Sequence, residues 1–192
     1  MASLTIKIIK NKTHEAHSIR VCKMAGVLAK EVAKIDHTIN ADLIQKASLY
    51  HDIGKAEIPN SILDKPGKLT DEEFVLMRKH SEIGANYIEK LEDKSVDPLL
   101  KMACEIARWH HERYDGHGYP DHLIKGNQIP MAAQITSVAD VYDALTSNRS
   151  YKKAFAPDEA IDMILHGKCG MFNPVILNCL LNCQSKLKAY IG

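Results

Sequence analysis

The sequence predicts an all-α domain, and three observations indicate this fold class. Apolar residues recur at steps of three and four along most of the chain, which places them on one face of a helix. Proline, asparagine or a Thr-x-x-Glu pattern precedes several of these stretches, as is typical of helix starts. Only 6% of the residues are aromatic, whereas alanine, isoleucine, leucine and lysine are abundant, which is typical of packed helices. We therefore expect a bundle of about seven helices and no pair of strands.

The first two predicted helices span residues 14–35 and the stretch from Asn40 to the pair His51-Asp52. The inward-facing stripe of the first helix comprises His17, Val21, Met24, Leu28, Val32 and Ile35. Asn40 is a suitable N-cap for the second helix, whose inner positions are Leu43, Ile44, Ala47 and Tyr50. Gly54 predicts the end of that helix.

The middle of the chain predicts a loop followed by two helices. Residues 57–68 contain two prolines and a glycine, which favours a loop. The capping-box sequence from Thr70 to Glu73 opens a helix with Phe74, Met77, Ile88 and Leu91 facing inward. Asp97-Pro98 opens the next helix, whose inner residues are Met102, Ala103, Ile106, Ala107 and His110.

A long loop and three further helices complete the predicted domain. No periodicity is present from Glu112 to Ile129, and loops of this length in compact domains are often functional. Pro130 opens a helix with one apolar side, and Thr136 and Asp140 lie on another side. Pro157 and Pro174 begin the last two helices.

Composition limits the class of protein. The chain has 192 residues, of which 45% are apolar, enough for one domain with a sizeable core. The formal net charge is +1 and no basic run is present, so binding to nucleic acid is not expected. No apolar stretch reaches transmembrane length, no signal peptide is recognisable, and the five cysteines contain no CxxC pair. We expect a cytoplasmic protein with free thiols and no membrane contact.

Seven potential metal ligands fall at helix ends or on inward faces of the predicted helices. A single inward histidine is more often a hydrogen-bonded core residue than a ligand. Burying all seven without partners would cost roughly several kcal/mol each, and a bound cation offsets that cost. Two metal ions that share a carboxylate need about this many ligands and leave room for a bridging hydroxide. The set predicts metal-assisted hydrolysis and comprises His17, His51, Asp52, His80, His110, His111 and Asp140.

The chain contains a series of short motifs in a fixed order: His51-Asp52-Ile53-Gly54-Lys55, Ile58-Pro59, Lys65-Pro66-Gly67-Lys68-Leu69-Thr70, His80-Ser81-Glu82-Ile83-Gly84, His110-His111-Glu112, Asp115-Gly116-His117-Gly118-Tyr119-Pro120 and Ala139-Asp140-Val141-Tyr142-Asp143-Ala144-Leu145-Thr146. This series resembles the HD-GYP subgroup of the HD phosphohydrolase superfamily over roughly residues 14–180. The resemblance implies an all-helical HD-domain bundle with a long GYP loop that hydrolyses cyclic di-GMP. We expect an N-terminal segment at residues 1–13 and a catalytic domain at residues 14–192.

The resemblance also assigns roles to individual residues. One metal ion would be held by His17, His51, Asp52 and Asp140, and the other by His80, His110 and His111, with Asp52 bridging both. Asp52 and Lys55 are the expected catalytic residues, and Fe or Mn are the expected metals. The substrate phosphate would be bound by Lys55, Arg149 and Lys152. Tyr142 and Asp143 are expected to be structural or to support the ligands.

One departure from the family concerns the number of metal ions. Some HD-GYP proteins have a glutamate four residues before the first histidine, which helps to hold a third metal. This chain has Thr13 there, so we expect two metals and the linear dinucleotide pGpG as the product.

The Gly118-Tyr119-Pro120 turn has two interpretations of equal weight. It could contact a diguanylate cyclase partner, or Tyr119 could pack on the domain. Two alternatives to the main function also stay open. The chain could be an HD hydrolase that acts on another cyclic dinucleotide, or a non-catalytic module that binds a dinucleotide or a partner protein.

Overall fold

The described part of the chain is helical, as predicted. The computed structural model describes residues 12–91, 97–122, 126–148 and 153–191. Within these ranges no strand is present apart from an isolated bridge between Lys168 and Gly170. The predicted boundary between residues 13 and 14 stays a prediction.

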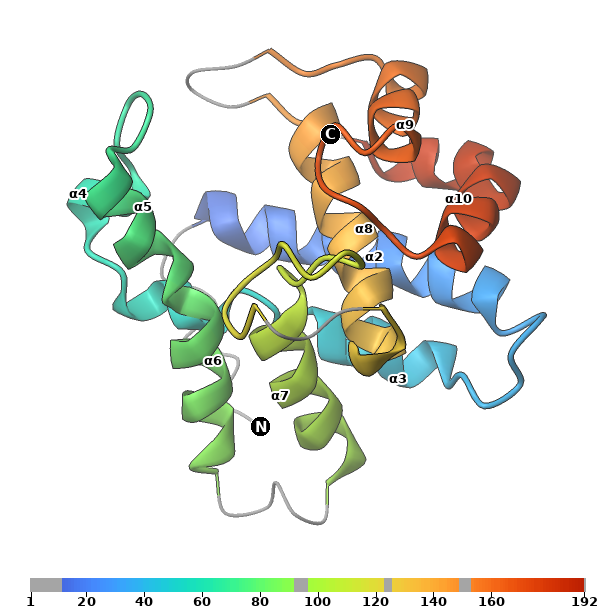
Figure 1. Cartoon of the computed structure of the whole chain (residues 1–192), viewed down its shortest axis with the longest axis horizontal. Coiled ribbons are helices and arrows are strands. Elements are labelled where there is room, and N and C mark those ends of the chain that lie inside the picture. The colour runs from blue at the N-terminus through green and yellow to red at the C-terminus, as the bar shows by residue number, and fades with distance from the viewer. Residues whose placement is uncertain (1–11, 92–96, 123–125, 149–152, 192) are drawn as a thin grey trace.

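A long central helix organises the fold. Helix α2 (Lys12–Val32) packs against α3 (Ala41–Ser48), α8 (Met131–Thr146) and α10 (Pro174–Leu187). Figure 1 shows α8 crossing α2 near the middle of the molecule. The core lies at this crossing, where Met24 and Leu28 of α2 and Ile135 and Val138 of α8 are at most 1% exposed. Their burial supplies much of the hydrophobic stabilisation of the domain.

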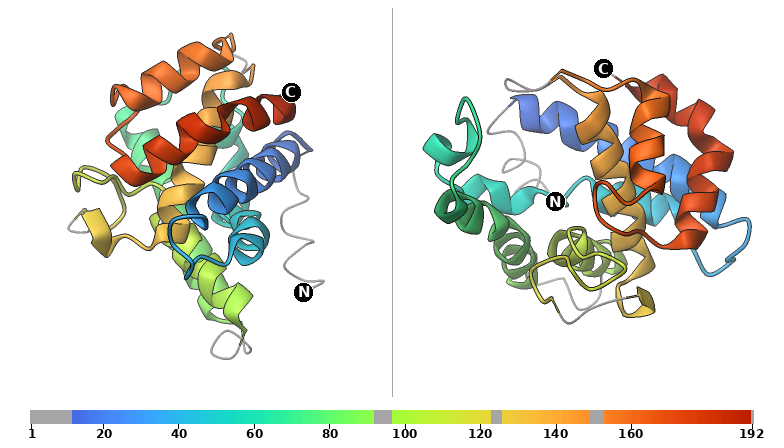
Figure 2. Two further views of the ribbon diagram at one scale, coloured as in Figure 1. Left: turned by 90° about the vertical axis from the view of Figure 1, so that its right-hand side faces the viewer. Right: turned by 45° about the horizontal axis from the view of Figure 1, so that its top comes forward.

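Two groups of helices flank the central crossing. Helix α9 (Pro157–Leu165) packs against α8 and α10, and Figure 2 shows α9 and α10 together on one side. On another side, α6 (His80–Glu89) and α7 (Pro98–Trp109) form an antiparallel pair, and α7 packs against α3 and α8. The end of α3, the start of α6 and the end of α7 therefore lie close to one another, beside the central crossing.

Several predicted helix starts are confirmed by their capping contacts. The Asn40 side chain accepts a hydrogen bond from the backbone N–H of Leu43 at 3.0 Å. Thr70 and Glu73 form the predicted capping box. Asp97 and Asn173 cap α7 and α10, and each is followed by a proline at the first helical position.

The predicted helix over residues 70–91 is wrong in one respect, because it is two helices. Helix α5 (Asp71–Arg78) ends at Lys79, and α6 begins at His80. Helix α5 and the short α4 (Asn60–Leu63) form an arm away from the core, so no residue of α5 is buried. Phe74, expected to face inward, is 43% exposed. The loop expected at residues 57–68 contains α4, which adds a helix to the number expected.

The end of α3 also differs from the prediction. Helix α3 stops at Ser48, and turns carry the chain through His51 and Asp52 into a 3-10 helix over Ile53–Glu57. Glycine at position 54 permits this path because it has no Cβ, and a Cβ there would clash with the carbonyl oxygen of His80 at 2.0 Å. Ile35 was expected in the inward stripe of the first helix but is 65% exposed, since α2 ends at Val32.

Two remaining expectations concern cysteines and membranes. All five cysteines lie within the described ranges, and none of them forms a disulfide. No helix in the described part of the chain combines the length and apolar character needed to cross a membrane.

Candidate metal centre

Side chains from distant parts of the chain converge in the space between α2, α6, α7 and α8. All seven residues singled out in the sequence lie there, in two groups, and within each group the potential ligand atoms are within 4.8 Å of one another. They are His17 on α2, His51 and Asp52 in the turns after α3, His80 at the start of α6, His110 and His111 at the end of α7, and Asp140 on α8.

The first group consists of His17, His51 and Asp140. The Nε2 atom of His17 lies 3.2 Å from Oδ1 of Asp140 and 3.3 Å from Nε2 of His51. His51 is fully buried, and the other two side chains are 12% and 13% exposed. Two imidazoles and one carboxylate therefore face a common point with little access for solvent.

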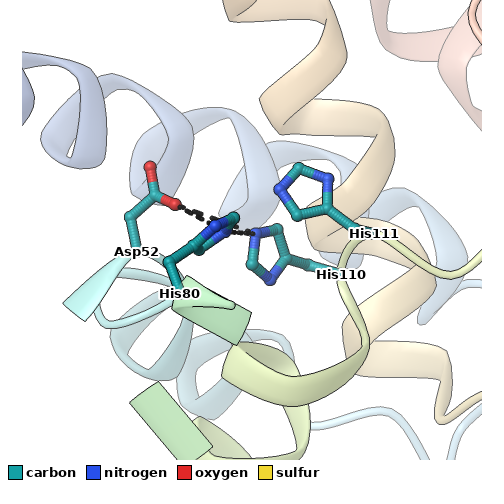
Figure 3. A group of neighbouring side chains, drawn as sticks. All are labelled: Asp52, His80, His110 and His111. Atoms are coloured by element: carbon teal, nitrogen blue, oxygen red, sulfur yellow. Dashed lines mark hydrogen bonds and ion pairs between the residues drawn. The ribbon is translucent and has the colours of Figure 1, made fainter. Parts of the chain in front are cut away.

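The second group consists of Asp52, His80, His110 and His111, whose side chains point toward one another in Figure 3. Nε2 of His80 lies 3.3 Å from Oδ1 of Asp52 and 3.5 Å from Nε2 of His110. The His111 ring lies beside both histidines, with centroids 5.0 Å from His80 and 4.0 Å from His110. Three imidazoles and a carboxylate oxygen thus surround a second point.

Asp52 lies between the two groups and turns one oxygen toward each. Its Oδ2 is 3.3 Å from Nε2 of His51 and 3.6 Å from Nε2 of His17. Its Oδ1 faces His80 in the second group and is buried without a hydrogen-bond partner in the described part of the chain. A buried carboxylate oxygen without a donor is costly, and a cation at this position would satisfy it. This is the arrangement expected of a carboxylate that bridges two metal ions.

Backbone carbonyls fix the orientation of three of the histidine rings. The Nδ1 atom of His51 donates to the backbone carbonyl of Ser48 at 2.9 Å. In the same way, Nδ1 of His80 donates to the carbonyl of Met77 at 2.7 Å, and Nδ1 of His110 donates to that of Ile106 at 3.0 Å. A carbonyl oxygen only accepts, so each Nδ1 carries a proton and each ring turns its Nε2 atom inward. The Nε2 atoms of His80 and His110 then face each other without a proton between them. Such an arrangement is unfavourable alone and suits a cation.

The electrostatics of the centre keep Asp52, His80 and His110 in the forms that bind metals. Burial lowers the pKa of His80 to about 4 and that of His110 to about 3, so both rings are neutral near pH 7. Burial alone would raise the pKa of Asp52, but Lys55, His51 and His17 outweigh it and hold that pKa well below its usual range. Neutral imidazoles beside an ionised carboxylate are a typical ligand set for a divalent transition metal.

His17 differs from the other histidines because carboxylates surround it. Burial lowers its pKa, but hydrogen bonds to Asp140, Asp143 and Asp52 outweigh this effect and raise the pKa well above its usual value. Its Nδ1 donates to Oδ2 of Asp143 at 2.7 Å, which directs Nε2 toward Asp140 and Asp52. A cation bound between these oxygens would take the place of the Nε2 proton.

Arg20 is a site residue that the sequence analysis missed. Its Nε donates to Oδ1 of Asp143 at 2.6 Å, and its Nη2 donates to Oδ2 of Asp143 and to Oγ of Ser147. Asp143, which is 1% exposed, is thereby held against His17. The signal was the spacing, because Arg20 lies three residues after His17 and therefore on the same face of α2.

The loop that follows α7 folds back onto the centre. The ring of Tyr119 stacks on His111, with centroids 4.6 Å apart and an interplanar angle of 23°. Glycine at position 118 allows the loop to come this close because it has no Cβ, and a Cβ there would clash with Cα of Glu112 at 2.4 Å. Of the two interpretations of the Gly118-Tyr119-Pro120 turn, this geometry favours the one in which Tyr119 packs on the domain.

A cleft of about 830 Å³ lies beside the two ligand groups, which contribute part of its lining. His17, His80, His111 and Tyr119 line one part of it, and the arm formed by α4 and α5 lines another. Lys55 also lines the cleft, with its Nζ 2.6 Å from Oδ2 of Asp52. The volume suits a small organic ligand. The predicted phosphate-binding residues Arg149 and Lys152 lie outside the described residues.

Comparisons with known sequences identify the family of this chain and several of its relatives. A model of the HD domain family matches residues 3–172. A cyclic di-GMP phosphodiesterase from Vibrio cholerae is 44% identical over 181 residues, which cover 91% of this chain and 37% of the relative. A 3'3'-cGAMP-specific phosphodiesterase 2 from the same organism is 43% identical over 141 residues, covering 73% of this chain and 26% of the relative.

The fold is also found in a solved structure. An HDG"Y"P protein from Bdellovibrio bacteriovorus superposes with a TM-score of 0.65 at 19% identity, covering 95% of this chain and 57% of that chain. The helical fold predicted from the sequence is therefore confirmed by an independent structure. This chain spans well under half the length of the two relatives from Vibrio cholerae.

Proposed function

Since the chain belongs to the HD domain family, we propose that it is a metal-dependent phosphodiesterase that hydrolyses cyclic di-GMP. One observation carries this proposal: Asp52 turns one oxygen toward each of two histidine groups at a cleft. The name of the cyclic di-GMP phosphodiesterase from Vibrio cholerae supports the choice of substrate. The motifs of the HD-GYP subgroup, present in order along the chain, support the same choice.

The donor set fits two divalent transition metal ions. His17, His51 and Asp140 would hold one ion, His80, His110 and His111 would hold the other, and Asp52 would be shared. When bound, the two ions would lower the pKa of water and offset charge on the phosphate. Five imidazoles favour transition metals over magnesium or calcium, and we propose iron or manganese from the family resemblance.

Lys55 would act on the phosphate of the substrate. Its ammonium group lines the cleft and lies beside Asp52, so a phosphodiester oxygen that enters there meets a positive charge. Negative charge grows on the phosphate oxygens in the transition state, and a fixed cation stabilises it more than it stabilises the bound substrate. We assign Arg149 and Lys152 to phosphate binding as well, from the resemblance alone.

The product and the partner are finer parts of the proposal. Thr13 in place of a glutamate supports two metal ions rather than three, and hence pGpG as the product. A diguanylate cyclase partner would have to use exposed parts of the GYP loop, such as His117, whose side chain is 85% exposed. Tyr119 is occupied by its contact with His111.

A second candidate function is hydrolysis of another cyclic dinucleotide. The relative from Vibrio cholerae that is named as specific for 3'3'-cGAMP is 43% identical to this chain over the residues it matches, against 44% for the cyclic di-GMP enzyme over a longer match. The same metal centre would serve both reactions, because the scissile phosphodiester is common to both substrates. Only the bases differ, so a comparison of substrates separates the two functions.

The test is turnover by protein purified without oxygen and supplied with Fe(II) or Mn(II). Cyclic di-GMP, 3'3'-cGAMP and cyclic di-AMP are compared, with products resolved by chromatography and metal content measured on the same sample. We expect conversion of cyclic di-GMP to pGpG and about two metal ions per chain. No turnover of any of the three by metal-loaded protein would refute the proposal, and a preference for 3'3'-cGAMP would favour the second candidate.

A pair of variants links the activity to the metal centre. Asp52→Asn removes the shared carboxylate, and we expect hydrolysis to fall to background together with the metal content. Asp42→Asn removes a carboxylate in the first turn of α3 that is 76% exposed and belongs to neither ligand group, and it should behave as the unmodified protein. If Asp52→Asn retained both metals and turnover, Asp52 would not be the shared ligand.

A further inference from the structure

Helix α5 presents an aromatic side chain to the cleft that the fold does not need. Phe74 lines the cleft and is 43% exposed, although phenylalanine is usually buried. No residue of α5 is buried, so Phe74 contributes little to the core. Its position is better explained by a ligand in the cleft than by folding.

Arg78 supports one face of the Phe74 ring. Its guanidinium carbon lies 4.5 Å from the centroid of Phe74 and 5.1 Å from that of Tyr119. The two residues are four apart on α5, a spacing that places them on one face of the helix. A cation over an aromatic ring is attracted to it, so Arg78 holds the ring in one orientation. A ring that is already ordered loses less entropy when a ligand stacks on it.

The surroundings of Phe74 in the cleft suit a nucleobase. Met77 on α5 and Leu69, in the segment between α4 and α5, also line the cleft and provide an apolar setting for a flat ring. Lys68, from the segment between α4 and α5, lines the cleft and is exposed, which adds a positive charge suited to a phosphate. The metal centre lines the same cleft, so a dinucleotide with its phosphodiester at the centre has room for a base beside the arm.

We propose that Phe74, supported by Arg78, is a stacking platform for one purine base of the dinucleotide substrate. This inference rests on the proposed function and names the part of the substrate that α5 recognises. Stacking needs only an aromatic face and makes no hydrogen bonds to the base edge. The platform therefore contributes affinity for any purine dinucleotide, and the choice between guanine and adenine is made elsewhere.

The test compares three variants on one helix. Phe74→Ala removes the platform, Phe74→Tyr keeps an aromatic face, and Leu76→Ala shortens a neighbouring side chain that is 40% exposed and does not line the cleft. Binding of a hydrolysis-resistant phosphorothioate analogue of cyclic di-GMP is measured by calorimetry on metal-loaded protein. Metal content and the thermal midpoint are recorded for each variant.

We expect Phe74→Ala to weaken binding of the analogue about 5- to 150-fold, the range that corresponds to stacking of one base. Phe74→Tyr and Leu76→Ala should bind as the unmodified protein does, and all variants should keep their metals. Turnover of bis(p-nitrophenyl) phosphate, which has no purine, should change far less in Phe74→Ala than turnover of cyclic di-GMP.

Two outcomes separate this inference from the proposed function. If the unmodified protein binds the analogue and Phe74→Ala binds it equally well, or if Leu76→Ala loses as much, the platform is refuted while the function stands. If the unmodified, metal-loaded protein does not bind the analogue, the proposed action on cyclic di-GMP itself fails.

Discussion

Replacing Asp143 by asparagine should weaken metal binding at the group that contains His17. Asp143 accepts the Nδ1 proton of His17 at 2.7 Å and two bonds from Arg20 at 2.6 and 3.0 Å. Asparagine has nearly the same shape, but only one of its two polar atoms can accept. Either the histidine or the arginine must therefore lose its acceptor and meet an amide N–H instead.

The size of the effect follows from these contacts. Removing a residue that orients a metal-bound histidine typically lowers metal affinity about 10- to 100-fold. Asp143 is 1% exposed and Arg20 is 25% exposed, so the lost charged hydrogen bonds should also destabilise the fold by about 1–3 kcal/mol. The second group of ligands does not contact Asp143 and should keep its metal.

The assay is metal titration of chelator-treated protein, with content measured by mass spectrometry and stability by thermal unfolding of the metal-free form. Asp158→Asn is the matched control, since it removes a carboxylate that likewise pairs with a cationic side chain, Lys188 at 2.7 Å, but is 78% exposed. A surface pair contributes at most about 1 kcal/mol, so the control should change little. If Asp143→Asn bound two metals with unchanged affinity, the reasoning that Asp143 positions His17 would be wrong.

Three further predictions concern the centre and its supports. Tyr119→Ala should reduce the metal content of the second group, because the ring that stacks on His111 is lost, whereas Tyr119→Phe keeps the ring and should retain the metal. Metal content is measured by mass spectrometry, and equal metal content in the two variants would count against the stacking role. Gly54→Ala should destabilise the fold by about 1–3 kcal/mol or more, because its Cβ would lie 2.0 Å from the His80 carbonyl oxygen, and an unchanged thermal midpoint would contradict this. Removing metal with a chelator should lower the thermal midpoint of unfolding, because metal binds only the folded centre. The midpoint is measured by calorimetry after the chelator is dialysed away, and an unchanged midpoint would argue that the centre is empty in the purified protein.

The sequence predicted the helices of the core well because their signals are local. The Asn40, Asp97 and Asn173 caps and the capping box of Thr70 each form within one turn of chain, so the residues alone indicate them. The errors occur where packing decides. The break at Lys79 lacks a proline or glycine signal, and it places His80 at the start of a new helix where its Nδ1 donates to the carbonyl of Met77.

The composition of the centre was predictable, but its geometry was not. Counting inward histidines and aspartates identified all seven residues that converge in the structure. Periodicity could not reveal that Arg20 and Asp143 form a unit with His17, since they are 123 residues apart and join only when α2 packs on α8. Nor could it reveal that Phe74 lines the cleft, because an apolar residue at a helical spacing predicts burial.

The adjacent pairs of ligands show why the centre lies at helix ends. His51 and Asp52 follow the last turn of α3, and the first belongs to one group while the second faces both. In the middle of a helix, successive side chains point about 100° apart, which would turn one of each pair away from the site. Where a helix gives way to turns, the backbone is free to direct both inward, as it does at the end of α7 for His110 and His111. A fold whose helices end together around one point can therefore collect two metal groups from few segments of chain, and Gly54 and Gly118 allow the segments after α3 and α7 to approach closely enough to do so.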